Sequence, residues 1–133
     1  MNASVRKGGL VRPAEVERYF ERYGWAVTRI REQQWQAAFA GDHDTLTVTL
    51  DLAPDWLSFA IDLSAYWHSD DSVRDLLVAN AEMKLVKFAL DTQGHLLLQA
   101  ELPTEGFAYS HFVDCLGALS HYADNFVGET ERH

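Results

Sequence analysis

The stretch Thr45–Leu63 (TLTVTLDLAPDWLSFAIDL) decides the fold of this chain. In its two halves, Thr45–Leu52 and Leu57–Leu63, apolar side chains alternate with threonine, serine, alanine and aspartate. Side chains of a strand point alternately to its two faces, so each half predicts a strand with one apolar and one wet face. The turn residues Ala53-Pro54-Asp55 separate the halves. Two such strands at hairpin spacing indicate an antiparallel sheet with one face open to water.

Four further strands are predicted on either side of this hairpin. Segments rich in β-branched, aromatic or aliphatic residues lie at Trp25–Arg31, Gln34–Ala40, Val86–Asp91 and Leu96–Leu102. The last two are joined by Thr92-Gln93-Gly94, which is a hairpin signal. We therefore expect one antiparallel sheet of five or six strands.

Three helices complete the predicted domain. Apolar residues recur at helical spacing in Pro13–Tyr23, in Asp70–Met83 and in Tyr109–Val127. The apolar side chains of the last helix form one narrow stripe, as in a helix that lies on a sheet. The order is helix, four strands, helix, two strands, helix. This pattern predicts a single α+β domain over residues 13–133, preceded by a flexible tail over residues 1–12.

The second helix is apolar on more than one side. Val73 and Leu77 share one side, whereas Val78 points roughly opposite Val73 at 100° per residue. A helix that is apolar on two sides is usually covered on two sides. We therefore predict a homodimer whose interface contains Val73, Leu77 and Val78.

The segment Asn80–Leu102 (NAEMKLVKFALDTQGHLLLQAEL) contains a helix end, a strand, a glycine hairpin and a strand. Together with the following helix, which ends near Tyr122-Ala123-Asp124, this pattern resembles the YbjN family of bacterial proteins. The fold of that family is similar to that of class I type III secretion chaperones. The resemblance implies a homodimer that holds other proteins, with a chaperone-like or regulatory role and no enzymatic activity.

Charge is unevenly distributed along the chain. The net charge is −9, of which residues 1–31 contribute +4 (seven basic, three acidic) and residues 32–133 contribute −13 (four basic, seventeen acidic). An acidic body repels phosphate backbones, so direct nucleic-acid binding is disfavoured. A partner protein with a basic region is favoured, including one that itself binds nucleic acid. The alternative is that acidity only maintains solubility.

Metal and catalytic sites find little support in the residue pattern. The six histidines are scattered, and no cluster has ligand spacing, so we expect no metal and no cofactor. His111 and Cys115 are four residues apart on a helix, but Cys115 falls in the apolar stripe and is expected to be buried. Asp51 and Asp62 lie on wet strand faces, where solvated carboxylates are the ordinary interpretation.

Aromatic side chains gather near the end of the hairpin and in the loop after it. Trp56 lies beside a turn, and Tyr66 and Trp67 follow the strand. Aromatic residues in loops are common contact residues at interfaces. We therefore predict a partner-binding role for Trp56, Tyr66 and Trp67, with burial under the second helix as the alternative.

The predicted function is a non-enzymatic, chaperone-like module that binds a partner protein through a sheet edge or groove. The alternative is a small-molecule-binding or enzymatic domain on a similar sheet, which would gather several titratable groups in one apolar pocket. No apolar run approaches the ~20 residues of a membrane span, no signal peptide is evident, and the one cysteine forms no internal pair. These features predict a cytoplasmic protein.

Overall fold

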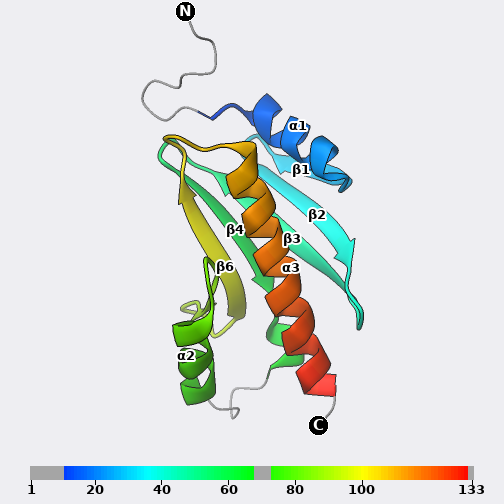
Figure 1. Ribbon diagram of the computed structural model, residues 1–133, viewed down its shortest axis with the longest axis vertical. Coiled ribbons are helices and arrows are strands. Elements are labelled where there is room, and N and C mark those ends of the chain that lie inside the picture. Colours follow the sequence, from blue (N-terminus) through cyan, green and yellow to red (C-terminus); the bar gives the residue numbers. More distant parts are fainter. Residues whose placement is uncertain (1–10, 68–72, 132–133) are drawn as a thin grey trace, which may run out of the picture.

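The structure, a computed structural model, describes residues 11–67 and 73–131 (Figure 1). Its elements are α1 (Pro13–Tyr23), β1 (Val27–Arg31), β2 (Gln34–Ala40), β3 (Thr45–Leu52), β4 (Trp56–Asp62), η1 (Ser64–Tyr66), α2 (Val73–Glu82), β5 (Lys87–Leu90), β6 (Leu96–Pro103) and α3 (Tyr109–Glu131). The expected order of helices and strands is confirmed. The predicted start of the second helix at Asp70 lies outside the described residues.

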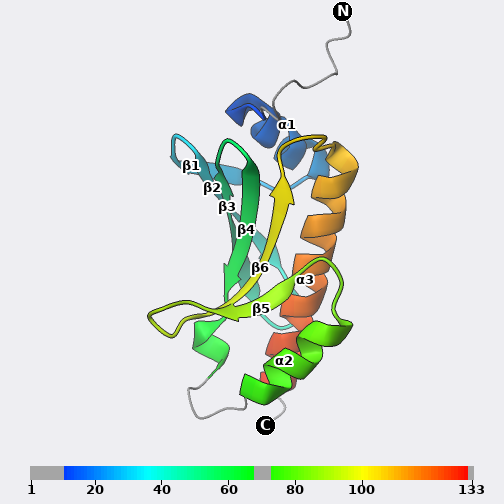
Figure 2. The same cartoon turned by 90° about the vertical axis from the view of Figure 1, so that its left-hand side faces the viewer.

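The strands form one six-stranded antiparallel sheet in the order β1-β2-β3-β4-β6-β5. In the centre, Phe59 of β4 pairs with Leu50 of β3 on one side and with Ala100 of β6 on the other. After β4 the chain passes through α2 before it returns in β5 and β6, so β6 lies between β4 and β5. This places α2 beside the β5 end of the sheet (Figures 1 and 2).

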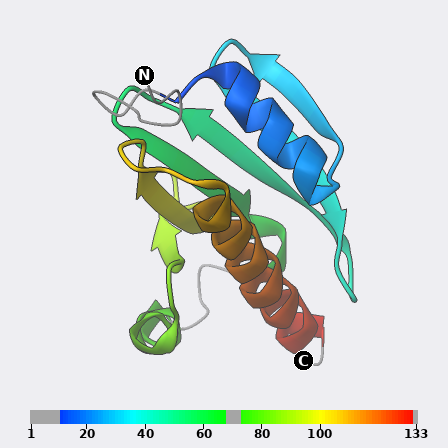
Figure 3. The same cartoon turned by 45° about the horizontal axis from the view of Figure 1, so that its top comes forward.

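The core lies between the sheet and α3, which crosses one face of it (Figure 3). Buried sheet residues such as Leu50 and Leu98 face buried residues of α3 such as Phe112 and Leu119. The alternate positions of β3, among them Thr47, point to the open face. The predicted apolar stripe of the last helix and the one-sided strands are thus confirmed.

Aromatic contacts fix α1 against the start of α3. The ring of Phe20 meets Phe112 edge-on with centroids 4.9 Å apart. Trp35 of β2 is fully buried, and its indole N–H donates a 3.0 Å hydrogen bond to Glu17 of α1. Val11 is also buried, so the packed part of the chain begins two residues before α1. The predicted flexible tail therefore does not include Val11 and stays a prediction for residues 1–10, which lie outside the described residues.

The outer edge of the sheet at β5 is closed by the side chain of Asn80 in α2. Its amide donates to the carbonyl of Phe88 at 3.0 Å, and its carbonyl oxygen accepts from the N–H of Phe88 at 2.7 Å. Lys87 reaches back from the same strand, and its ammonium donates to the main-chain carbonyls of Asn80 and Met83 at 2.6 and 2.5 Å. These bonds satisfy carbonyls at the C-terminal end of α2, where a cation is also favoured by the helix dipole.

Candidate protein-binding surface

Helix α2 carries a cluster of exposed apolar side chains. Leu77 is 63% exposed, Val78 56% and Val73 42%, and Leu76 is the buried residue of the helix. Burial of an apolar side chain stabilises a protein by about 1.5–3 kcal/mol, so several exposed ones on a single helix indicate a surface that is covered by something else. All three residues that we predicted for a dimer interface are accessible.

An apolar groove continues this surface onto the sheet edge. It has a volume of about 120 Å³ and runs between α2 and β5. Val73 and Leu77 line it on the helix side, and Leu90, itself exposed, lines it on the strand side. Because Asn80 occupies the strand edge at Phe88, a partner is expected to contact side chains here rather than to add a strand at that position.

The three aromatic residues predicted to bind a partner do not form one patch. Trp56 begins β4 and is 50% exposed, on the open face of the sheet beside Pro103. Tyr66 and Trp67 follow the other end of β4. Because a seven-residue strand is about 20 Å long, they lie far from Trp56. Both are partly buried against the core. The structure therefore offers Trp56 as an isolated contact residue and places the other two in a packed environment.

Tyr66 has a clear structural contact. Its hydroxyl donates a short hydrogen bond to the carboxylate of Asp44, in the turn between β2 and β3. This bond lowers the pKa of Asp44, and a further bond from the N–H of Thr45 acts in the same direction. The contact ties η1 to a turn that sequence spacing alone would not bring near it.

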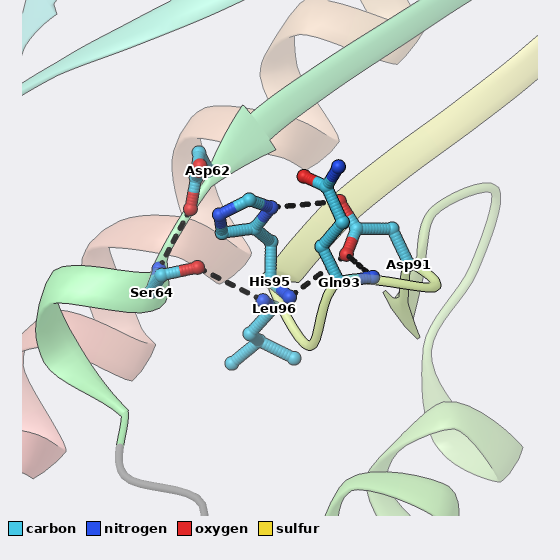
Figure 4. A network of polar contacts seen from close by, with 6 residues as sticks. All are labelled: Asp62, Ser64, Asp91, Gln93, His95 and Leu96. Atoms are coloured by element: carbon cyan, nitrogen blue, oxygen red, sulfur yellow. Dashed lines mark hydrogen bonds and ion pairs between the residues drawn. The ribbon is translucent and has the colours of Figure 1, made fainter.

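The turn between β5 and β6 is built around Asp91 (Figure 4). One carboxylate oxygen accepts the N–H groups of Gln93 and His95, each at 2.9 Å, and the other contacts the His95 ring, also at 2.9 Å. Next to it, the hydroxyl of Ser64 accepts the N–H of Leu96 at 3.0 Å. This network fixes the hairpin beside η1. Its ionisable members, Asp91 and His95, are exposed turn residues, whereas Leu96 is buried and lines the groove between α2 and β5.

The two candidate catalytic pairs do not form. Cys115 is fully buried, and burial raises the pKa of its thiol to about 12, so it is a packing residue as expected. His111 instead accepts the N–H of Ala108 at 3.1 Å, at the start of α3. Asp51 accepts a hydrogen bond from Gln34 at 2.8 Å, whereas Asp62 accepts from the N–H of Ser64 at 2.9 Å, at the far end of the neighbouring strand.

Within residues 11–67 and 73–131, no group of three or more histidine, cysteine, aspartate or glutamate side chains is arranged to hold a metal ion. Over the same residues, no helix combines the length and the apolar character that crossing a membrane requires.

A second groove was missed by reading the sequence. It lies between α2 and the C-terminal half of α3 and has a volume of about 400 Å³. Leu76, Met83, Phe88 and Phe126 contribute apolar surface to it, and acidic residues of both helices border it. No local pattern marks this groove, because its two walls are about forty residues apart in the chain and each helix shows only its own periodicity.

Comparison with known proteins gives matches at the level of structure. No family model matches the chain, and no curated protein matches it. Two solved structures are similar over most of both chains: the ExsC–ExsE complex (20% identity, 86% of this chain and 92% of that chain, TM-score 0.61) and the Yersinia pestis type III secretion chaperone SycH in complex with a stable fragment of YscM2 (19% identity, 85% and 97%, TM-score 0.57). The chain has the type III secretion chaperone fold.

The likeness confirms the fold class expected from the sequence, an α+β domain with three helices and a six-stranded antiparallel sheet in the order α-ββββ-α-ββ-α. At 19–20% identity it concerns the fold alone. Membership of the YbjN family therefore stays a prediction from the pattern of Asn80–Leu102.

Proposed function

We propose that this chain is a non-enzymatic, chaperone-like or regulatory module that binds a partner protein as a homodimer in the cytoplasm. The exposed apolar side chains of α2 are the observation that carries the proposal, because more than half of Leu77 and of Val78 stays exposed in the single chain. The fold supports it further, since both similar structures are complexes between a protein of this fold and a second protein.

We assign the dimer contact to the exposed apolar side chains of α2, which are Val73 and Leu77 on one side of the helix and Val78 on the other. Val78→Asp is expected to weaken dimerisation, because a charge placed in an apolar contact is costly to desolvate. The matched control is Thr47→Asp, an exposed position on the open face of the sheet. Light scattering coupled to size exclusion measures both. A wild-type protein that stays a monomer of 15.1 kDa at micromolar concentration contradicts the proposal.

Partner binding is assigned in part to Trp56, the one large aromatic side chain that is half exposed on the open face. Tyr66 and Trp67 are proposed to contribute through the parts of their rings that remain accessible. Immobilised wild-type protein should retain a specific protein from the native cell, and calorimetry with that protein, once purified, should show weaker binding by Trp56→Ala. If the Trp56→Ala variant and the wild type bind the partner with equal affinity, Trp56 is not part of the binding surface.

An enzymatic or small-molecule-binding role has less support from the geometry. The carboxylates, histidine and cysteine with a displaced pKa are Asp44, Asp91, His95 and Cys115, and they belong to two turns and the core of α3. None of them lines either groove beside α2. An active site would instead gather such groups around one cavity.

A further inference from the structure

The groove between α2 and α3 combines an apolar floor with an acidic border. Phe88 and Phe126 contact each other in its floor, with ring centroids 5.3 Å apart and the ring planes tilted by 53°, and Leu76 and Met83 also line it. Glu82 and Asp75 border it on α2, and Glu129 borders it on α3. Its volume of about 400 Å³ is within the range of sites that take up bulky side chains.

Two carboxylates of the acidic border, those of Glu82 and Glu129, are available for an external cation. Glu82 and Glu129 are exposed, and within the described parts of the chain neither makes a hydrogen bond or an ion pair. The nearby Lys87 does not neutralise them, because its ammonium is bonded to the carbonyls of Asn80 and Met83. Lys84 is the other lysine of this loop, and its main-chain N–H donates to the hydroxyl of Tyr122 at 3.4 Å.

We propose that this groove binds a short helical segment of the partner protein in which a bulky apolar side chain is flanked by lysine or arginine. The apolar side chain would enter between Phe126 and Leu76, and the flanking cations would meet Glu82 on one wall and Glu129 on the other. An amphipathic helix in a groove between two helices is a recurrent mode of recognition. The inference rests on the proposed protein-binding function and names the chemistry of the bound segment.

The groove and the Val73–Leu77 part of the proposed dimer contact use different sides of α2. At 100° per residue, Leu77 lies about 160° from Ala79 of the groove wall, whereas Val78 lies one turn before Glu82, beside the border of the groove. A dimer formed through Val73 and Leu77 therefore leaves the groove open, and each protomer would bind its own segment.

The probe is a short fluorescent amphipathic peptide of leucine and lysine, titrated into the full chain at physiological ionic strength, with a leucine–glutamate peptide as its counterpart. The lysine peptide should bind and the glutamate peptide should not. Amide NMR signals of residues 76–83 and 122–129 should shift on binding. Absence of binding, or shifts confined to other elements, overturns the proposal.

Two pairs of variants separate the groove from general acidity. Glu82→Gln with Glu129→Gln should weaken peptide binding by about three- to tenfold, since exposed charge pairs contribute roughly 0.2–1 kcal/mol each. Asp51→Asn with Glu101→Gln removes the same charge from the open face of the sheet and should weaken binding much less. Equal losses of peptide affinity for the two pairs of variants would assign the effect to net charge and overturn the proposed binding site.

Filling the groove tests its apolar floor without changing charge. Ala79→Phe, on the wall of the groove, should abolish peptide binding, whereas Ala38→Phe on the open face should leave it unchanged. Thermal unfolding verifies that both variants fold. Unchanged binding by a folded Ala79→Phe overturns the proposal. If the native partner binds the wild type and both groove variants equally, the protein-binding function stands and only this docking site is wrong.

Discussion

Leu85 has a backbone conformation that leucine rarely adopts. Its φ is 72°, and the N–H of Val86 bonds the carbonyl of Lys84 at 2.8 Å, which closes a three-residue γ-turn around it. A left-handed conformation costs a residue with a Cβ about 1–2 kcal/mol. The side chain of Leu85 is 44% exposed, so burial does little to offset that cost. The strain is the consequence of turning the chain sharply from α2 into β5.

Comparing two small residues at this position isolates the backbone cost. Leu85→Gly should be more stable than Leu85→Ala by roughly 0.5–1 kcal/mol, because glycine adopts positive φ without a steric penalty. At the exposed helical position 81 the order should reverse, and Ala81→Gly should cost about 1 kcal/mol. Urea unfolding of the three variants measures these differences. If the Leu85→Ala variant is at least as stable as the Leu85→Gly variant, the turn at position 85 is not strained.

His95 and Asp91 form an exposed ion pair in the turn between β5 and β6. The hydrogen bond that His95 donates to Asp91, together with the negative charge of Asp91, raises the pKa of His95 above the ordinary 6.5, and Asp62 adds to this. Since the pKa is raised in the folded state, the stabilisation is complete below pH 6.5 and is lost as pH rises through the folded pKa. The bonds from His95 lower the pKa of Asp91, so its own contribution is lost as pH falls below about 3.8.

An NMR titration tests this pair directly. Asp91→Asn should lower the pKa of His95 toward its ordinary value, because the negative charge and the accepting oxygen of the ion pair are removed. Asp62→Asn should lower it less, since Asp62 acts only through charge. An unchanged His95 pKa in Asp91→Asn would mean that the contact does not persist in solution.

At the scale of elements, helix α3 was predictable because its burial on one side imposes a regular spacing of apolar residues. It must cover a sheet face, so its apolar residues recur from Phe112 onward at helical spacing, and its predicted start at Tyr109 is confirmed. The strands were predictable for the same reason, since burial on one face imposes alternation. The structure extends the helix through Gly128 to Glu131, four residues beyond the predicted end.

Contacts between elements were not predictable from such local patterns. Asn80 is eight residues from Phe88, and whether its amide reaches the strand depends on how α2 is docked. The α2–α3 groove likewise depends on the separation of two helices. Exposure of Trp56 followed from its place beside a turn, but the packing of Tyr66 depends on Asp44, a residue twenty-two positions away.

Truncation of a core residue of α3 tests how tightly this helix packs. Leu119 is fully buried, so Leu119→Ala should lower the free energy of unfolding by about 2–5 kcal/mol through the cavity it leaves. Ala118→Gly, on a neighbouring and partly buried position, should cost only about 1 kcal/mol. Chemical denaturation gives both values. A loss well below 1 kcal/mol for Leu119→Ala would mean that this face of α3 is not part of the core.

At the scale of the whole molecule, charge is separated along the chain. The basic residues are concentrated in the first 31 positions, which include α1 and β1, whereas the remaining 102 positions carry −13. Exposed charges are screened beyond about 8 Å at physiological ionic strength. Charge of this kind therefore acts mainly on how fast an oppositely charged partner arrives, and under the proposed function apolar contacts such as Trp56 would determine how long it stays bound.

A partner with a basic region should accordingly associate more slowly as salt is raised. Stopped-flow mixing with the purified partner at two salt concentrations should show a marked fall in the association rate and a smaller change in the dissociation rate. Trp56→Ala should do the opposite and mainly speed dissociation. If the association rate does not depend on salt, the acidity of residues 32–133 serves solubility only.

A sheet with unpaired edge strands can aggregate edge to edge, especially at high protein concentration. The last strand of one copy then pairs with the first strand of the next, and a fibre grows. Here one end of the sheet is already occupied at Phe88 by the amide of Asn80. The other end has an irregular register between Arg29 and Arg31, two exposed cations that repel a second copy of themselves. Both ends are therefore poor templates for polymerisation, so the proposed apolar contact surface of α2 can stay exposed without growth of a fibre.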